Sequence, residues 1–94
     1  AFELARDRIT VNAVCPGLTI TPLVQGAARA GELEMLAKRI PLGELVLPEH
    51  IADAVLFYCS TRARMVTGTS LDVDGGMSLG MQDMDSYFAA RRRA

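Results

Sequence analysis

The sequence predicts an α/β fold built on one β-α-β unit. Two segments rich in β-branched and apolar residues, Ile9–Cys15 and Ser70–Asp74, have the pattern of strands. Between them, Pro48–Ser60 opens with proline and carries apolar residues at helical spacing. Because a helix connects the two strands, we expect them to be parallel and adjacent, joined by a right-handed crossover.

The first strand leads into a loop that has the features of a ligand site. Both faces of Ile9–Cys15 are partly apolar, which favours a strand buried in a parallel sheet. Pro16 lacks a ladder donor, and Gly17 allows a turn or the close approach of a ligand. Thr21 is a good N-cap before a proline. A loop between a strand's carboxyl end and a helix is where ligands bind in open α/β sheets.

A helical excursion separates the loop from the long helix. Pro22–Ala30 is predicted as a helix that ends near Gly31, and Glu32–Arg39 as a second short helix that ends before Pro41. The whole excursion, Pro22–Val46, is longer than an ordinary connection, which indicates a functional segment.

Length and composition limit the classes of function. Ninety-four residues make at most one small domain, and half of them are hydrophobic, as in a globular protein. A net charge of −1 gives no electrostatic basis for binding nucleic acid or an anionic membrane surface. No apolar run has the length of a membrane span. We expect Cys15 and Cys59 to be two buried, reduced thiols in a cytoplasmic protein.

Three motifs in a fixed order indicate a family. They are Asn-Ala-Val-Cys-Pro-Gly at Asn12–Gly17, with Thr21 four residues beyond the glycine, then Pro-Glu-His-Ile-Ala from Pro48, then Thr-Gly-Thr-Ser-Leu-Asp-Val-Asp-Gly-Gly at Thr67–Gly76. In this order the chain, from about Glu3 to Gly80, resembles the carboxyl-terminal part of short-chain dehydrogenases/reductases. The resemblance implies a Rossmann-type, doubly wound parallel sheet, of which residues 1–94 form the carboxyl-terminal portion of a dinucleotide-binding domain. It also implies NAD or NADP as cofactor and an alcohol or ketone as the small-molecule substrate.

The resemblance assigns cofactor binding to Pro16, Gly17, Thr19 and Thr21. In the family, backbone groups at the position of Thr19, which is more often valine or isoleucine, bind the nicotinamide carboxamide. The position of Thr21 hydrogen-bonds the carboxamide or the pyrophosphate. A hydroxyl and free N–H groups at a helix start are suited to an anion. The residues alone leave open that Thr21 is only an N-cap.

The same resemblance places a substrate lid over the excursion. Leu23, Val24, Met35 and Leu36 occupy the region that covers the substrate in the family. Ordinary core packing is the alternative for each of these residues taken singly. Together they predict an apolar lid without identifying the substrate.

The family's catalytic residues do not occur in these motifs. Tyr58 is followed four residues later by Arg62, and Tyr87 by Arg91, so neither forms a Tyr-x-x-x-Lys pair. We therefore expect a carboxyl-terminal fragment, inactive alone and with no catalytic residue, of an oxidoreductase that is a homodimer or homotetramer. A non-catalytic assembly module and a truncated remnant are the alternatives.

Three other features of the sequence do not indicate a functional site. His50 has no nucleophile at a meaningful spacing and is expected to be exposed in a first helical turn. Asp72 and Asp74 alternate before glycine, but no further acidic ligand follows, so no metal site is predicted. The tail, Met77–Ala94, has acidic residues early and arginines late, which suits a short terminal helix.

Overall fold

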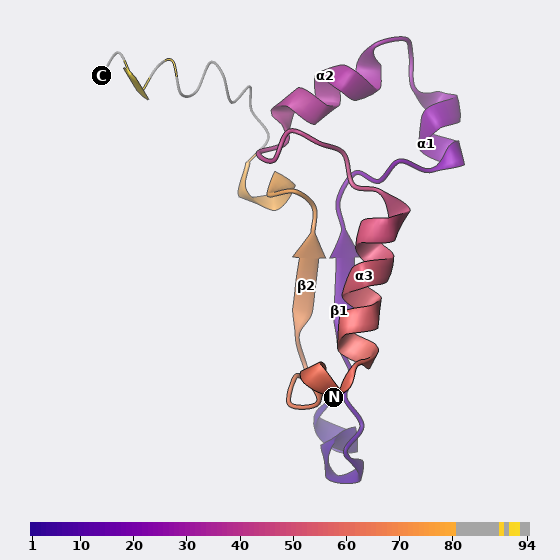
Figure 1. Ribbon diagram of the computed structural model, residues 1–94, viewed down its shortest axis with the longest axis vertical. Coiled ribbons are helices and arrows are strands. Elements are labelled where there is room, and N and C mark those ends of the chain that lie inside the picture. The colour runs from indigo at the N-terminus through magenta and orange to yellow at the C-terminus, as the bar shows by residue number, and fades with distance from the viewer. Residues whose placement is uncertain (81–88, 90, 93–94) are drawn as a thin grey trace.

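The computed structural model, which describes residues 1–80, 89 and 91–92, confirms the predicted β-α-β unit (Figure 1). Two parallel strands lie side by side, a long helix runs along them, and two short helices extend beyond their carboxyl ends. In chain order the elements are β1 (Ala13–Pro16), α1 (Pro22–Ala27), α2 (Glu32–Arg39), α3 (Pro48–Cys59) and β2 (Ser70–Val73).

The strands pair in a parallel register that runs from Ala13 opposite Ser70 to Pro16 opposite Val73. The predicted start at Ile9 is wrong, because regular pairing begins only at Ala13. Before Ala13, the segment that lies opposite is the irregular stretch that leads from a turn into β2. Val11 N–H donates to the Thr67 hydroxyl at 3.1 Å, so a side chain takes the place of a backbone partner.

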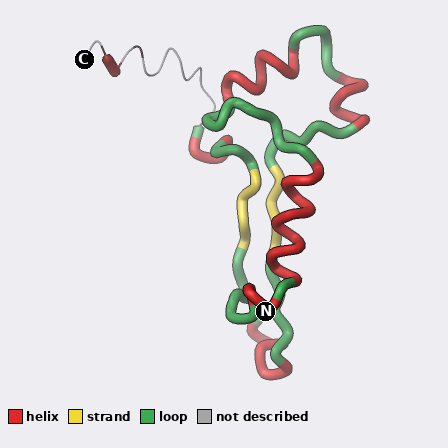
Figure 2. Tube along the Cα trace, viewed as in Figure 1, coloured by secondary structure: helices red, strands yellow, loops and turns green. Residues whose placement is uncertain are grey.

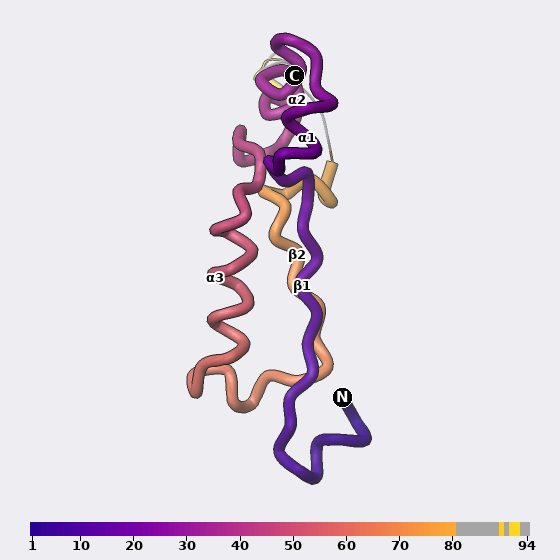
Figure 3. Tube along the Cα trace, turned by 90° about the vertical axis from the view of Figure 1, so that its right-hand side faces the viewer, coloured from indigo at the N-terminus to yellow at the C-terminus, as the bar shows by residue number. Residues whose placement is uncertain are grey.

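Helix α3 packs on one face of the two strands, and the described residues place no helix on the other face (Figure 3). The prediction of a buried β1 is therefore wrong for this chain. Val14 is half-buried, whereas Ala13 and Cys15 are exposed. The reason is geometric, since a single helix can cover only one side of a sheet.

The buried apolar core is small and gathers near the carboxyl edge of the sheet. Ile40, Leu45 and Val46 are buried there, and Ala54 and Ala63 are buried farther along the chain. Fourteen large apolar residues of the described chain are exposed, among them residues on α1, α2, α3 and β2. A domain with so little interior is marginal in stability without further packing.

The two cysteines differ from their predicted environment. Both Cys15 and Cys59 are free thiols, as expected, but both are exposed and not buried. Cys15 lies on the strand of the thinly covered sheet, and Cys59 is the last residue of α3. Cys15 is exposed because α3 covers only one face of the sheet, and Cys59 borders an open cavity.

The excursion contains the two predicted helices with one change of boundary (Figure 2). Helix α2 spans Glu32–Arg39, as predicted, whereas α1 ends at Ala27 and not at Ala30. Gly31 does not terminate α1. It has φ of 77° and is the N-cap of α2, where the left-handed conformation suits glycine.

Helix α3 begins where the sequence predicts, and its first turn is capped by His50. Leu47 has no side chain that could cap, but its N–H donates to His50 Nδ1 at 2.9 Å. His50 N–H in turn donates to the Leu47 carbonyl at 2.9 Å. His50 is exposed in the first turn, as expected, and it is also a capping residue.

The two ends of the chain add short segments. The amino-terminal segment, Phe2–Asp7, is a 3-10 helix. Met77–Leu79 forms another 3-10 turn after β2. The terminal helix predicted for the tail lies mostly outside the described residues, and Ala89, Arg91 and Arg92, which are described, are helical.

Candidate functional site

The candidate site lies at the carboxyl edge of the sheet, where β1 passes into the loop that precedes α1 (Figure 1). Pro16 is the last residue of β1. Gly17 continues the strand direction, since its N–H donates to the Val73 carbonyl at 3.0 Å. A Cβ built on Gly17 would lie 2.6 Å from Asp74 Cβ, closer than real Cβ contacts come. Gly17 therefore allows the two strand ends to meet at backbone distance.

The next residues pair with the segment that leads into α3. Val46 N–H donates to the Leu18 carbonyl at 3.0 Å, and Ile20 N–H donates to the Val46 carbonyl at 2.8 Å. Thr19 is thus the bridge residue opposite Val46, and its own backbone groups face away from that segment. Within the part of the chain that the structure describes, Thr19 N–H has no hydrogen-bond partner. The Thr19 hydroxyl donates to the Gly17 carbonyl at 3.0 Å.

Thr21 caps helix α1. Its hydroxyl oxygen accepts from Val24 N–H at 3.3 Å, and Pro22 occupies the first helical position. Capping uses only one acceptor position of the hydroxyl, which keeps its own proton to donate. The capping contact is therefore compatible with a second, ligand-binding role for Thr21.

The four residues predicted as a lid lie on the two helices of the excursion. Leu23 and Val24 are on α1, and Met35 and Leu36 are on α2. Leu23 is 82% exposed and Met35 is 61% exposed, whereas Val24 and Leu36 are half-buried. The excursion thus carries apolar side chains that the described chain leaves uncovered at the carboxyl edge.

Sequence reasoning considered Asp74 only as a metal ligand and missed its place in the structure. Asp74 Oδ1 accepts from Gly76 N–H and Asp74 Oδ2 from Ser78 N–H, both at 2.9 Å. The Ser78 hydroxyl, the Ser78 N–H and the Gly76 N–H lower the pKa of the Asp74 carboxyl from its ordinary value of 3.8. An aspartate directly before two glycines is typical of such a turn, and that signal could have identified it.

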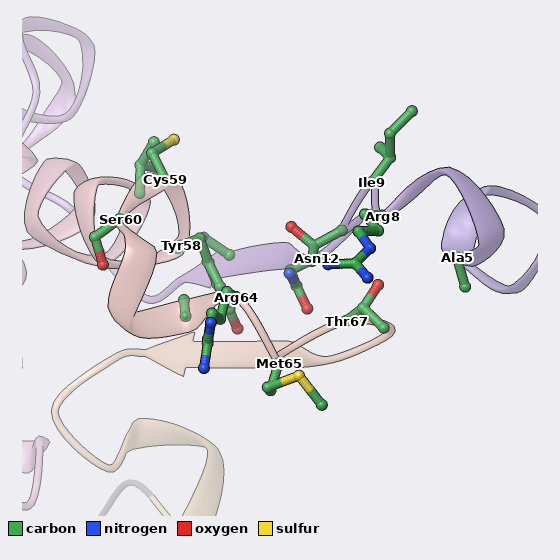
Figure 4. A pocket seen from close by; sticks show the side chains of 14 residues that line it. Ala5, Arg8, Ile9, Asn12, Tyr58, Cys59, Ser60, Arg64, Met65 and Thr67 are labelled. Atoms are coloured by element: carbon green, nitrogen blue, oxygen red, sulfur yellow. The ribbon is translucent and has the colours of Figure 1, made fainter.

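A cavity lies at the opposite end of the strands from the candidate loop, and Figure 4 shows the side chains that line it. It measures about 1000 Å³ and is open, with Arg8, Asn12, Tyr58 and Arg64 among its lining residues. Asn12 Oδ1 accepts from the Thr69 hydroxyl at 2.7 Å, and that hydroxyl lies 2.8 Å from the Tyr58 hydroxyl. None of the predicted site residues lines this cavity.

A second cavity of about 430 Å³ lies between α2 and the start of α3. Ile20, Leu33, Leu45 and His50 contribute to its lining. Ile20 comes from the candidate loop, but the four predicted cofactor residues and the four lid residues do not line this cavity. Neither of these two cavities of the described residues therefore contains the candidate site.

Metal clusters and membrane-spanning helices are not found in the described part of the chain. No group of three or more His, Cys, Asp or Glu side chains is placed to hold a metal ion among the described residues. None of the described helices has the length and apolar character that crossing a bilayer requires.

Known proteins resemble this chain in both sequence and fold. A family model described as enoyl-(acyl carrier protein) reductase matches residues 1–78. The chain is 44% identical over 84 residues to the short-chain dehydrogenase anuF of Penicillium roqueforti, a match that covers 87% of this chain and 30% of that protein. It is 48% identical over 75 residues to a 3alpha-hydroxysteroid dehydrogenase of Mediterraneibacter gnavus, and this match covers 80% of this chain and 30% of that protein.

A solved structure matches the fold as well. It is the crystal structure of an oxidoreductase of the short-chain dehydrogenase/reductase family from Burkholderia thailandensis, with a TM-score of 0.83 and 36% sequence identity. The match covers 96% of this chain and 36% of that one. The chain thus spans about a third of the length of each of these three proteins. Its motifs, its parallel β-α-β unit and these relatives agree: the chain belongs to the short-chain dehydrogenase/reductase family.

Proposed function

We propose that this chain is the carboxyl-terminal part of an NAD(P)-dependent oxidoreductase that transfers a hydride between nicotinamide and an alcohol or ketone. Family membership supports the reaction class, and relatives about three times as long support a larger whole. The acid and base that move the substrate proton come, in this proposal, from residues outside these 94. The chain alone is expected to be inactive.

The observation that carries the proposal is the unpartnered N–H of Thr19 at the carboxyl edge of the sheet, as the described residues place it. When bound, the nicotinamide supplies the hydride donor or acceptor. Thr19 N–H would donate to the carboxamide oxygen, and the Thr21 hydroxyl would donate to the carboxamide or the pyrophosphate. Pro16 and Gly17 would hold the loop at the edge where a cofactor can approach its backbone.

The excursion would act as the substrate lid. Leu23 and Met35 present apolar surface that is exposed in the described chain. Covering a substrate with such side chains would remove water from the reacting carbon and favour an apolar substrate body. Val24 and Leu36 would support these side chains from the same helices.

Titration of the full-length protein with nicotinamide cofactor tests the proposal at Thr21. Thr21→Ala removes the hydroxyl and should weaken cofactor binding by roughly threefold to tenfold, the effect of one neutral hydrogen bond. Thr21→Ser retains the hydroxyl and serves as the matched control, with affinity close to that of the parent. Folding is checked by circular dichroism. If the alanine variant binds as tightly as the parent, Thr21 is only the cap of α1.

A second function, assembly, is favoured by the exposed apolar surface of α3 and β2. Leu56 is 66% exposed, Phe57 46% and Leu71 40%, so the two elements leave large apolar side chains uncovered in the described chain. We propose that this surface contributes to a homodimer or homotetramer contact. Leu56→Glu should shift the full-length protein toward monomer in light scattering, whereas Gln25→Glu on α1 should not. A parent protein that is monomeric at all concentrations would exclude this role.

We also propose a cytoplasmic location. The support is the pair of free thiols, Cys15 and Cys59, which a reducing compartment would maintain. Fractionation of cells that express the full-length protein would test it, and recovery from an oxidising compartment would contradict it.

A further inference from the structure

A tight turn after β2 lies between the two parts of the candidate site. The turn, Asp74–Gly76, contacts the candidate loop through Gly17. On its other side, Leu42 N–H donates to the Gly75 carbonyl at 3.0 Å. Leu42 belongs to the segment that closes the helical excursion and returns the chain to α3. The turn thus touches both the loop that precedes the excursion and the segment that follows it.

Packing on both sides of the turn is close. A Cβ on Gly17 would meet Asp74 Cβ at 2.6 Å and Asp74 Cα at 2.7 Å. A Cβ on Gly75 would lie 2.8 Å from Ile40 Cγ2, and Ile40 is fully buried. A Cβ on Gly76 would lie 3.1 Å from the ring of Pro41. A shift of the turn would therefore displace both the loop and the Ile40–Pro41 segment.

The Asp74 carboxylate holds the turn in this shape. Asp74 is the one buried polar or charged residue found in the described chain, at 9% exposure. Each of its oxygens accepts one backbone N–H, from Gly76 and from Ser78. The ionised carboxylate is acceptor-only, so both of its oxygens can accept these donors at once. An asparagine would place an NH₂ group against one of them.

We propose that Asp74 is a positioning residue that sets the spacing between the nicotinamide-side loop and the base of the substrate lid. The side chain touches neither ligand. It acts by fixing the turn against which Gly17 and Ile40 pack. The cofactor part of this inference rests on the proposed function, whereas the mechanical coupling of loop and lid base does not.

Amide hydrogen exchange on the full-length protein tests the coupling. In Asp74→Asn, the N–H groups of Ile20, Leu42 and Val46 should exchange on the order of tenfold faster, since their hydrogen bonds join the loop, the lid base and the turn. Ala13 N–H, which bonds to the Thr69 carbonyl at the far end of the sheet, should exchange at the parent rate. Equal acceleration at all four positions would indicate general destabilisation and overturn the proposal, as would no acceleration.

The matched control is Asp72→Asn on the same strand. Asp72 is exposed, and no hydrogen bond of its carboxylate is found in the described chain, so exchange should match the parent at all four positions. Asp74→Ser supplies a second variant, because a hydroxyl can accept one of the two N–H groups and, unlike asparagine, places no NH₂ group against the other. Its exchange rates should fall between those of the parent and of Asp74→Asn. Rates in Asp74→Ser as fast as in Asp74→Asn would contradict a role for the hydrogen bonds.

Cofactor kinetics give the functional readout. In Asp74→Asn, KM for the nicotinamide cofactor should rise roughly threefold to tenfold, and Asp74→Ser should recover part of that loss. Faster exchange with an unchanged KM and kcat would overturn the positioning role while leaving the mechanical coupling. A parent protein that binds no nicotinamide cofactor would refute the proposed function instead, and the exchange experiment would still decide the coupling.

Discussion

Replacing Gly17 by alanine tests the close contact between the two strand ends. The added methyl group would lie 2.6 Å from Asp74 Cβ and 2.7 Å from Asp74 Cα. Carbon atoms pack at about 3.5–4.0 Å, so the strands would have to separate by about 1 Å. Asp74 cannot yield by a side-chain rotation, because the atoms in conflict are its Cα and Cβ. Overpacking of this kind costs about 1–3 kcal/mol of unfolding free energy.

The hydrogen bond from Gly17 N–H to the Val73 carbonyl, 3.0 Å long, would weaken in the same movement. Urea unfolding of the full-length protein, followed by circular dichroism, measures the loss as a lower midpoint at unchanged slope. Gly26→Ala is the matched control. Gly26 lies inside α1, and nothing lies within 4 Å of the position that its methyl group would take, so alanine should add about 0.5–1 kcal/mol. Equal stability of Gly17→Ala and the parent would refute the contact.

Three further predictions concern single side chains. His50→Ala should cost about 0.5–2 kcal/mol of unfolding free energy, because Leu47 N–H loses its acceptor. Urea unfolding measures this loss, and an unchanged midpoint would contradict the capping role. Asn12→Ala should cost about 1–3 kcal/mol, since Asn12 bonds both Val66 and Thr69, and a thermal melt identical to that of the parent would contradict it. The lowered pKa of Asp74 means that its contribution to stability is present above pH 3.8 and is lost as pH falls through the folded-state value. The stability difference between the parent and Asp74→Asn should therefore shrink on acidification, and a constant difference would contradict the assignment.

Local patterns in the sequence were sufficient to predict the helices. Proline at the first turn of α1 and α3, and the apolar spacing of α2, are short-range signals. Gly31 was misplaced because glycine in a left-handed conformation serves either end of a helix, and the sequence does not say which. The identity of Thr21 as an N-cap needed only the residue itself and the proline behind it.

Features that depend on distant partners were not predictable. The start of β1 at Ala13 depends on where the other strand begins, and burial of Cys15 depends on layers that these residues do not supply. The contact of Gly17 with Asp74 joins residues far apart in sequence, so neither motif reveals it alone. Asp74 was considered for its charge, whereas its significance comes from two backbone donors brought in by the turn.

The parallel pairing of β1 with β2 has a consequence for folding during synthesis. The sheet is joined across a long stretch of chain, as Asn12 and Thr69 are bonded to each other 57 residues apart. A contact of that range forms late, since the entropy of closing the intervening segment has to be overcome before any pairing is gained. Helix α3 depends on local bonds and can form as it emerges from the ribosome. Among the described elements, strand β1 has no strand partner until the entire excursion and α3 have been synthesised, and an unpaired strand edge in that interval favours aggregation.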